Sequence, residues 1–205
     1  MKDAVTVPIP ENIDTRIASR VRGLRTERRM TLETLASKSG VSRSMISLVE
    51  RGESSATAVV LEKIAAGLNV SLATLFEHSG GPVNPLSQPR DRTRWRDPQT
   101  GYVRRNISPP NFPSPVQIVE VDLPAGTNVA YERGAREVNI HQQIWIQEGR
   151  VEVTVGHVTY SLSPDDCLAM QLNEPIAFHN RSRKAARYIV VLATQSSRIS
   201  AGGIA

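Results

Sequence analysis

The N-terminal third of the chain places its apolar residues every three or four positions, as amphipathic helices do. The first helix is expected from about Asp14, with that residue or Thr15 as its N-cap. The expected N-caps of the later helices are Thr31, Ser42, Thr57 and Ser71. These helices are expected to end near Gly40, Gly52, Leu68 and Phe76. The pattern predicts five short helices that share one core.

After residue 106 the pattern changes to the alternation of apolar and polar residues that strands show. Val151, Val153 and Val155 alternate with polar residues, and a two-residue turn, 156–157, leads into a returning strand. The expected strands cover residues 116–121, 144–146, 151–155, 158–162, 167–172, 176–178 and 188–192. Short strands at this spacing predict a sandwich or a barrel.

A stretch rich in glycine and proline separates the two patterns. We therefore expect a tail at 1–13, an all-α domain at 14–77, a linker at 78–97, an all-β domain at 98–196 and a C-terminal tail at 197–205. The linker ends in a basic run, 90–96, with four arginines around Trp95. Such a run either adds contacts to DNA or solvates a surface while Trp95 anchors it to the core, and we favour the second interpretation.

The composition is that of a globular protein with a mild basic excess, a formal net charge of +5 and a pI near 9.8. Such a balance is compatible with a nucleic-acid partner. The single cysteine, Cys167, excludes an internal disulfide framework and fits a reducing, cytoplasmic compartment; we expect it to be buried. No apolar run approaches a membrane span, and the N-terminal residues contain no hydrophobic signal region.

The helical region resembles the five-helix helix-turn-helix domain of the phage-repressor and XRE family. The matching segments are 24–25, 31–36, 39–42, 46–47, 50–52, 61–65 and 72–76. The resemblance implies that Arg25 and Glu50 form an internal ion pair between the first and third helices. It also implies that the third helix enters the major groove of double-stranded DNA.

The candidate DNA-binding residues lie around the start of the second helix and along the third: Thr31, Leu32, Ser42, Arg43, Ser44, Ser47, Leu48 and Arg51. Arg43 is the candidate for guanine, because a guanidinium bonds O6 and N7 together. Ser44 is expected to donate to a base or a phosphate. Met45 and Leu48 either touch thymine methyl groups or pack a dimer or domain contact.

Six arginines fall on the polar side of the first helix or just beyond it: Arg16, Arg20, Arg22, Arg25, Arg28 and Arg29. Apart from the expected pairing of Arg25, two interpretations stay open. The set is either a solvated basic face or a face that contacts phosphates.

The strand region, from about residue 103 to 195, resembles the cupin jelly roll. The resemblance is carried by the turns and strands at 124–126, 145–149, 151–156, 162–166 and 178–180. A metal-binding cupin needs a His-x-His pair, a glutamate and a further histidine. Counting from the turns, Gln142 stands at the glutamate position and Ile176 at the last histidine position, and 136–138 hold no histidine. We therefore expect no catalytic metal, although His141, His179 and Glu137 leave a regulatory metal site open.

The barrel interior is the expected place for a small organic effector. The candidate lining residues mix aromatic and polar groups: Tyr131, His141, Gln143, Trp145, Met170 and His179. The alternatives are a filled core without a ligand and a barrel that only dimerises.

These observations predict a cytoplasmic, dimeric transcriptional regulator, with a repressor as the first choice. It would bind operator DNA through its helices, would need no cofactor, and would sense an effector or dimerise through its cupin. One alternative is a metal-dependent cupin enzyme of the phosphonate-epoxidase type fused to a helix-turn-helix. The other is a helix-turn-helix that serves as a protein-interaction module.

Overall fold

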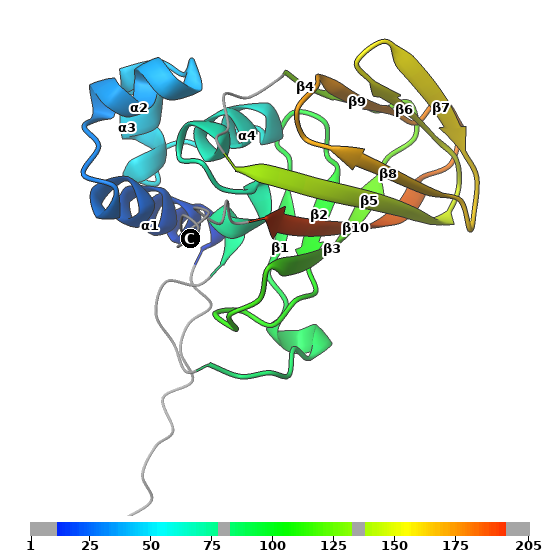
Figure 1. The fold of residues 1–205 in the computed structure, drawn as a ribbon, viewed down its shortest axis with the longest axis horizontal. Helices are drawn as coiled ribbons and strands as arrows, with labels where there is room; N and C mark the ends of the chain where they lie inside the picture. The colour runs from blue at the N-terminus through cyan, green and yellow to red at the C-terminus, as the bar shows by residue number, and fades with distance from the viewer. Residues whose placement is uncertain (1–11, 78–82, 133–137, 196–205) are drawn as a thin grey trace, which may run out of the picture.

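The computed structural model describes residues 12–77, 83–132 and 138–195 (Figure 1). These residues form a helical part followed by two β-sheets. The α-helices are α1 (Ile13–Glu27), α2 (Leu32–Ser39), α3 (Arg43–Glu50) and α4 (Ala58–Gly67). The short 3-10 helices are η1 (Leu72–Phe76) and η2 (Pro89–Asp91).

The helices begin where short polar side chains accept a hydrogen bond from the first turn. Thr31, Ser42, Thr57 and Ser71 are the N-caps of α2, α3, α4 and η1, as the sequence predicts. The N-cap of α1 is Asn12, so the expectation of Asp14 or Thr15 was wrong. The described residues hold four α-helices rather than five, because the last expected helix is only the 3-10 turn η1.

The helical core is built from the apolar stripe of each helix. Val21, Leu35, Ile46, Leu61 and Ile64 are fully buried there. α2 and α4 pack so closely that a β-carbon added to Gly67 would lie 2.8 Å from the β-carbon of Ser39. The turn between α2 and α3 needs a residue with positive φ, and Gly40 supplies it at 67°.

The strands form two antiparallel sheets that face each other. The six-stranded sheet has the order β1-β2-β3-β10-β5-β8, and the four-stranded sheet has the order β4-β9-β6-β7. The strands are β1 (Arg94–Arg96), β2 (Val103–Asn106), β3 (Val116–Leu123), β4 (Asn128–Tyr131), β5 (Asn139–Glu148), β6 (Val151–Val155), β7 (Val158–Leu162), β8 (Cys167–Gln171), β9 (Ile176–His179) and β10 (Ala186–Gln195). This is a β-sheet-rich domain consistent with a cupin.

The alternation along β5 decides which of its side chains point into the barrel. Ile140, Gln142, Ile144 and Ile146 are buried, whereas the residues between them are exposed. Gln142 pairs with Met170 of β8 across the ladder. The inner row of β5 is therefore the even-numbered one.

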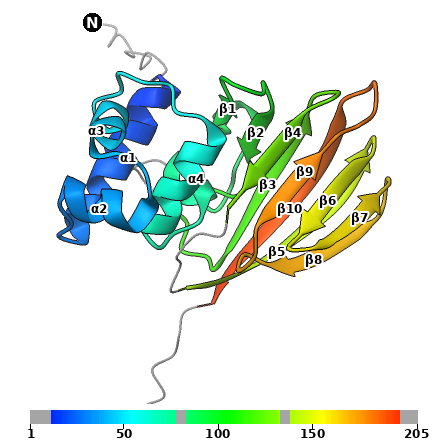
Figure 2. The same cartoon turned by 90° about the horizontal axis from the view of Figure 1, so that it is seen from above.

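The helical part and the sheets are joined by buried contacts. α4 lies between the sheets and the α2–α3 pair in both views (Figures 1 and 2). The buried carboxylate of Asp97 accepts from the N–H of Ala58 at the start of α4, at 2.7 Å. Trp95 packs on Phe76 of η1 and on Tyr102, with ring centroids 5.3 and 5.8 Å apart. Trp95 thus anchors its basic run to the core, which confirms that part of the favoured interpretation.

Strand β1 and helix η2 fall within residues 78–97, the stretch expected to be a linker. β1 is the edge strand of the six-stranded sheet and pairs with β2. Residues 78–82 of that stretch, the N-terminal tail up to residue 11 and the C-terminal residues 196–205 lie outside the described residues. Within the described ranges, no helix is both long and apolar enough to cross a bilayer.

Candidate nucleic-acid interface

Helix α3 lies at the end of the molecule that is farthest from the sheets (Figure 2). Its residues Ile46 and Val49 are buried against the other helices. The opposite side of the helix begins with Ser42, Arg43 and Ser44, which are all exposed. A short helix held by two buried residues therefore presents a polar N-terminal end to solvent, where a DNA groove has room to fit.

The remaining predicted DNA-binding residues differ in exposure. Thr31 and Arg51 are exposed, whereas Leu32, Ser47 and Leu48 are half-buried. Leu32 packs against the helical core, so its side chain contributes to folding. The structure therefore brings the starts of α2 and α3 together on one surface. Leu32 contributes only part of its side chain to that surface.

Arg43 is held by a residue of α2 that the sequence did not single out. Its Nε lies 2.5 Å from an oxygen of Glu33, and both side chains are about two-thirds exposed. The pKa of Glu33 is lowered, first by the hydrogen bond from its own backbone N–H and then by the charge of Arg43. Because the pair is exposed to water, Arg43 can exchange Glu33 for a base or a phosphate at small cost.

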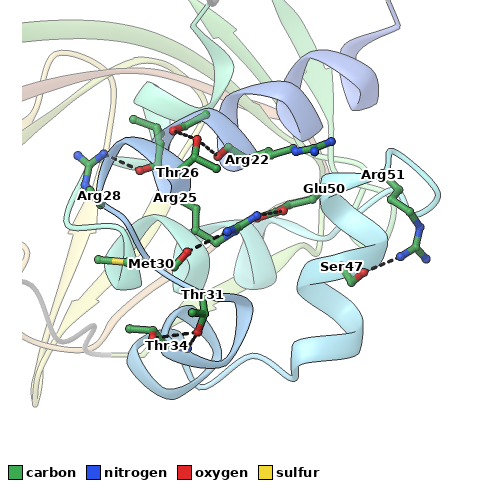
Figure 3. Close-up of polar contacts among 12 residues, drawn as sticks. Arg22, Arg25, Thr26, Arg28, Met30, Thr31, Thr34, Ser47, Glu50 and Arg51 are labelled. Carbon is green, nitrogen blue, oxygen red and sulfur yellow. Dashed lines mark hydrogen bonds and ion pairs between the residues drawn. The ribbon is translucent and has the colours of Figure 1, made fainter.

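Arg51 is also paired on the surface. It donates to Ser47 Oγ at 2.5 Å (Figure 3). It also donates to both carboxylate oxygens of Glu53, at 2.8 and 2.7 Å. The hydrogen bonds to Glu53 raise the pKa of Arg51. Both candidate arginines therefore have carboxylate partners: Arg43 pairs with Glu33 on the neighbouring helix α2, and Arg51 pairs with Glu53 two residues further along the chain.

The ion pair expected inside the domain is present. Arg25 donates to the two oxygens of Glu50 at 2.6 and 2.7 Å and to the carbonyl of Met30 at 2.8 Å (Figure 3). The side chains of Arg25 and Glu50 are only 15% and 7% exposed. The hydrogen bonds to Glu50 raise the pKa of Arg25. This pair fixes α3 on α1, which confirms its structural role.

The arginines of α1 divide into two groups. Arg16 donates to Thr93 at 2.6 Å, and Arg20 donates to the carbonyl of Thr74 and to Glu77. These two arginines, like Arg25, therefore hold the structure together, so the six arginines do not form one face. The others, Arg22, Arg28 and Arg29, are exposed and keep both of the interpretations that the sequence leaves open.

Most of the residues expected to line the barrel pocket lie elsewhere. His141, Gln143 and Trp145 are exposed on the outer face of the six-stranded sheet, because β5 buries the residues between them. The lining prediction chose the wrong row of β5, and a shift by one residue moves every side chain to the other face. Of the other three predicted residues, Tyr131 does line the pocket. Met170 packs against the core outside it, and His179 is half-buried on the outer face of β9.

Cys167 is exposed rather than buried, so that expectation was also wrong. It pairs with Trp145 across the ladder between β8 and β5, and therefore shares the outward row.

The residues at the cupin metal positions do not fit a metal. Gln142 and Ile176 both line the pocket, as the counting from the turns implies, but an amide and an isoleucine replace the carboxylate and the imidazole. His141 and His179 lie on the outer faces of different sheets and do not converge. Glu137 lies outside the described residues, and no group of three His, Cys, Asp or Glu side chains in the described ranges could hold a metal ion.

Two tightly joined helices with an exposed second member, packed by α1 and α4, define a helix-turn-helix domain. Residues 21–75 match the family model described as helix-turn-helix, HTH_3. The Escherichia coli K12 protein "HTH-type transcriptional regulator SutR" is 42% identical over 66 residues. That match covers 32% of this chain and 37% of the relative, so the chain spans little more than a third of that protein.

A solved structure shares the fold of both parts. The crystal structure of an HTH_3 family transcriptional regulator from Vibrio cholerae aligns over 90% of this chain and 98% of its own, at 22% identity and a TM-score of 0.70. Hydroxypropylphosphonic acid epoxidase from S. wedmorenis aligns over 87% of this chain and 97% of its own, at 19% identity and a TM-score of 0.43, a similarity too low to carry an argument. Residues 21–75 therefore form a helix-turn-helix domain of the HTH_3 type, and a β-sheet-rich domain consistent with a cupin follows it.

Proposed function

We propose that this protein is a transcriptional regulator that binds a specific double-stranded DNA site through α3. The observation that carries the proposal is the exposed start of that helix, where Ser42, Arg43 and Ser44 project from a frame locked by Arg25 and Glu50. Such a frame holds base-reading groups in place before DNA arrives. Arg43 reads a guanine, Ser44 donates to a base or a phosphate, and the exposed Arg22, Arg28 and Arg29 supply sequence-independent attraction.

The regulator acts as a homodimer on an inverted repeat. One α3 reads only a few base pairs, and two copies in successive major grooves lie about 34–36 Å apart. The outer face of the six-stranded sheet supports self-association, since Trp145 is 47% exposed there beside Cys167 and Ile189. Trp145→Asp shifts the sedimentation of the full chain toward the monomer, and an unchanged dimer after this substitution would place the contact elsewhere.

The barrel senses a small molecule and performs no metal-dependent reaction, because Gln142 and Ile176 stand where metal ligands would be needed. Occupancy of the operator blocks transcription, so the regulator is a repressor acting in the cytoplasm. A reporter gene placed behind the operator tests whether the protein represses or activates. Expression rises when a repressor is removed, and a fall in expression would make the protein an activator.

Selection from a random double-stranded DNA library tests the proposal directly. The full chain enriches an inverted-repeat motif, whereas Arg43→Ala enriches a motif with one position relaxed in each half. The matched control is Arg94→Ala, which removes the same charge from an exposed position on β1 and leaves the motif intact. If the full chain enriches no motif, the helix-turn-helix is a protein-interaction module instead.

A further inference from the structure

A pocket lies at the junction of the helical part and the barrel, and is called the junction pocket below. Glu62 of α4 and Leu72 of η1 line it from the helical side, and Val121, Phe178 and Leu192 line it from the two sheets. The enclosed cavity volume is about 60 Å³, and the whole hollow including its open mouth is about 680 Å³. A ligand in this pocket therefore touches both parts of the chain at once.

Two buried polar side chains, Arg104 and Gln142, line the junction pocket. Arg104 is 8% exposed, and its guanidinium lies over the ring of Phe76, 5.9 Å from the ring centroid. Its Nε has no hydrogen-bond partner, and no carboxylate of the described residues forms an ion pair with it. Gln142 is 7% exposed and lines the same pocket from β5. A buried charge without a carboxylate partner is costly, and native proteins keep few of them.

The aromatic groups around Arg104 favour a particular kind of guest. The hydroxyls of Tyr102 and Tyr131 lie 3.0 Å apart, and the rings of Phe178 and Tyr188 are stacked with centroids 5.8 Å apart. Burial raises the pKa of Tyr102, Tyr131 and Tyr188, so all three remain neutral hydroxyl groups at neutral pH. The pocket thus offers one cation and neutral hydroxyl groups to an acceptor, and apolar rings to the rest of the molecule.

The rim of the junction pocket limits the charge of the guest. Glu132 and Glu174 are exposed and mark its open side, and Glu132 is paired with Lys63 at 2.7 Å. A multiply charged anion such as a phosphate ester would meet these carboxylates on entry. A single carboxylate on an apolar body passes them and neutralises Arg104 inside.

We propose that the junction pocket binds a small monocarboxylic acid with an aromatic body, and that this acid is the effector of the regulator. The carboxylate pairs with Arg104, the amide of Gln142 donates to it, and the ring lies among Phe178 and the tyrosines. The effector role, but not the acid site itself, rests on the function proposed above. The bound acid couples to DNA through α4, which contacts the pocket through Glu62 and packs directly on α2.

Calorimetric titration of the full chain tests the acid site without DNA. The probes are benzoate, phenylacetate and 3-phenylpropionate, each compared with its neutral primary amide. At least one acid binds tenfold or more tightly than its amide, and the Nε–H resonance of Arg104, assigned by its loss in Arg104→Lys, moves on binding. Three results would each overturn the acid site. They are equal affinity for acid and amide, no binding of any acid at about 10 mM, and an Arg104 resonance that does not move.

Two variants separate recognition from folding. Gln142→Leu keeps the side-chain volume and reduces acid affinity at least fivefold, whereas Gln143→Leu, on the outer row of the same strand, leaves it unchanged. If both variants bind the acid as the parent does, Gln142 has no part in the site and the assignment fails. Circular dichroism confirms that each variant is folded before titration.

The effector role has its own measurement. The acid that binds changes the affinity of the full chain for its selected operator by about fivefold or more, as allosteric effectors typically do. An unchanged operator affinity at saturating acid overturns the effector role. If the library selection finds no operator, the proposed function fails while the calorimetric result still decides the acid site.

Discussion

The α3 surface and the junction pocket hold their charged groups in opposite ways. On the α3 surface, Arg43 and Arg51 are exposed and already paired with Glu33 and Glu53. In the pocket, Arg104 is buried and has no carboxylate partner within the described residues. Exposed pairs contribute little to folding and exchange partners easily, whereas a buried unpaired charge lowers stability until a ligand arrives. The difference suggests one surface suited to reversible contact with DNA and one cavity suited to retaining a small guest.

The largest expected effect comes from a buried pair that belongs to neither surface. Arg25→Ala leaves the nearly buried Glu50 without a partner and lowers the free energy of unfolding by about 3–5 kcal/mol. Arg51→Ala, which breaks an exposed pair, lowers it far less. Urea denaturation measures both. Similar losses for the two variants would remove the distinction between buried and exposed pairs.

The buried tyrosines predict a loss of stability at alkaline pH. Their folded-state pKa values lie above the unfolded value, so the folded protein binds more protons than the unfolded chain above about pH 10. Stability is therefore fully present below that pH and falls as pH rises beyond it, by up to about 1.4 kcal/mol per pH unit for each tyrosine. Unfolding at several pH values measures the slope, and Tyr131→Phe reduces it; an equal slope in that variant would place Tyr131 in contact with water.

An amide in the barrel interior costs free energy to desolvate, so an apolar side chain of similar volume there stabilises the protein. Gln142→Leu raises the free energy of unfolding by about 1 kcal/mol, because the side chain at this position is only 7% exposed. The exposed control Gln143→Leu changes it by no more than about 0.5 kcal/mol. A destabilised Gln142→Leu protein would show that the amide has a partner in solution.

The smallest expected effect concerns the exposed pair of the α3 surface. Glu33→Gln removes a carboxylate beside Arg43 and leaves folding stability nearly unchanged, because the pair is exposed to water. The same change strengthens DNA binding at low salt, because Arg43 no longer has to leave the carboxylate of Glu33 before it contacts a base or a phosphate. Fluorescence anisotropy with labelled operator follows this change, and weaker binding would mean that Glu33 orients Arg43 for the base.

The sequence predicted the helical part well because its signals are local. The caps Thr31, Ser42, Thr57 and Ser71 act within one turn, and the pairing of Arg25 with Glu50 follows from the family resemblance. The fifth helix is only a 3-10 turn, since the apolar spacing of so short a segment suits either geometry.

The junction pocket could not be predicted in the same way. Its polar groups come from β2, β4 and β5, and an error of one residue in β5 places His141 and Trp145 inside instead of Gln142. Counting from the turns did put Gln142 at a ligand position, which was the available signal. The partner of Arg43 and the buried cap formed by Asp97 depend on contacts between separate elements, and no local pattern reveals them.

The central claim is that α3 reads DNA through Arg43. It is tested most directly by measuring the affinity of the parent and of Arg43→Ala for the selected operator and for operators changed at each base pair in turn. The account predicts that the variant loses about 1–3 kcal/mol of discrimination at one base pair in each half-site and keeps its preferences elsewhere. Unaltered affinity and unaltered preference at every position would contradict it.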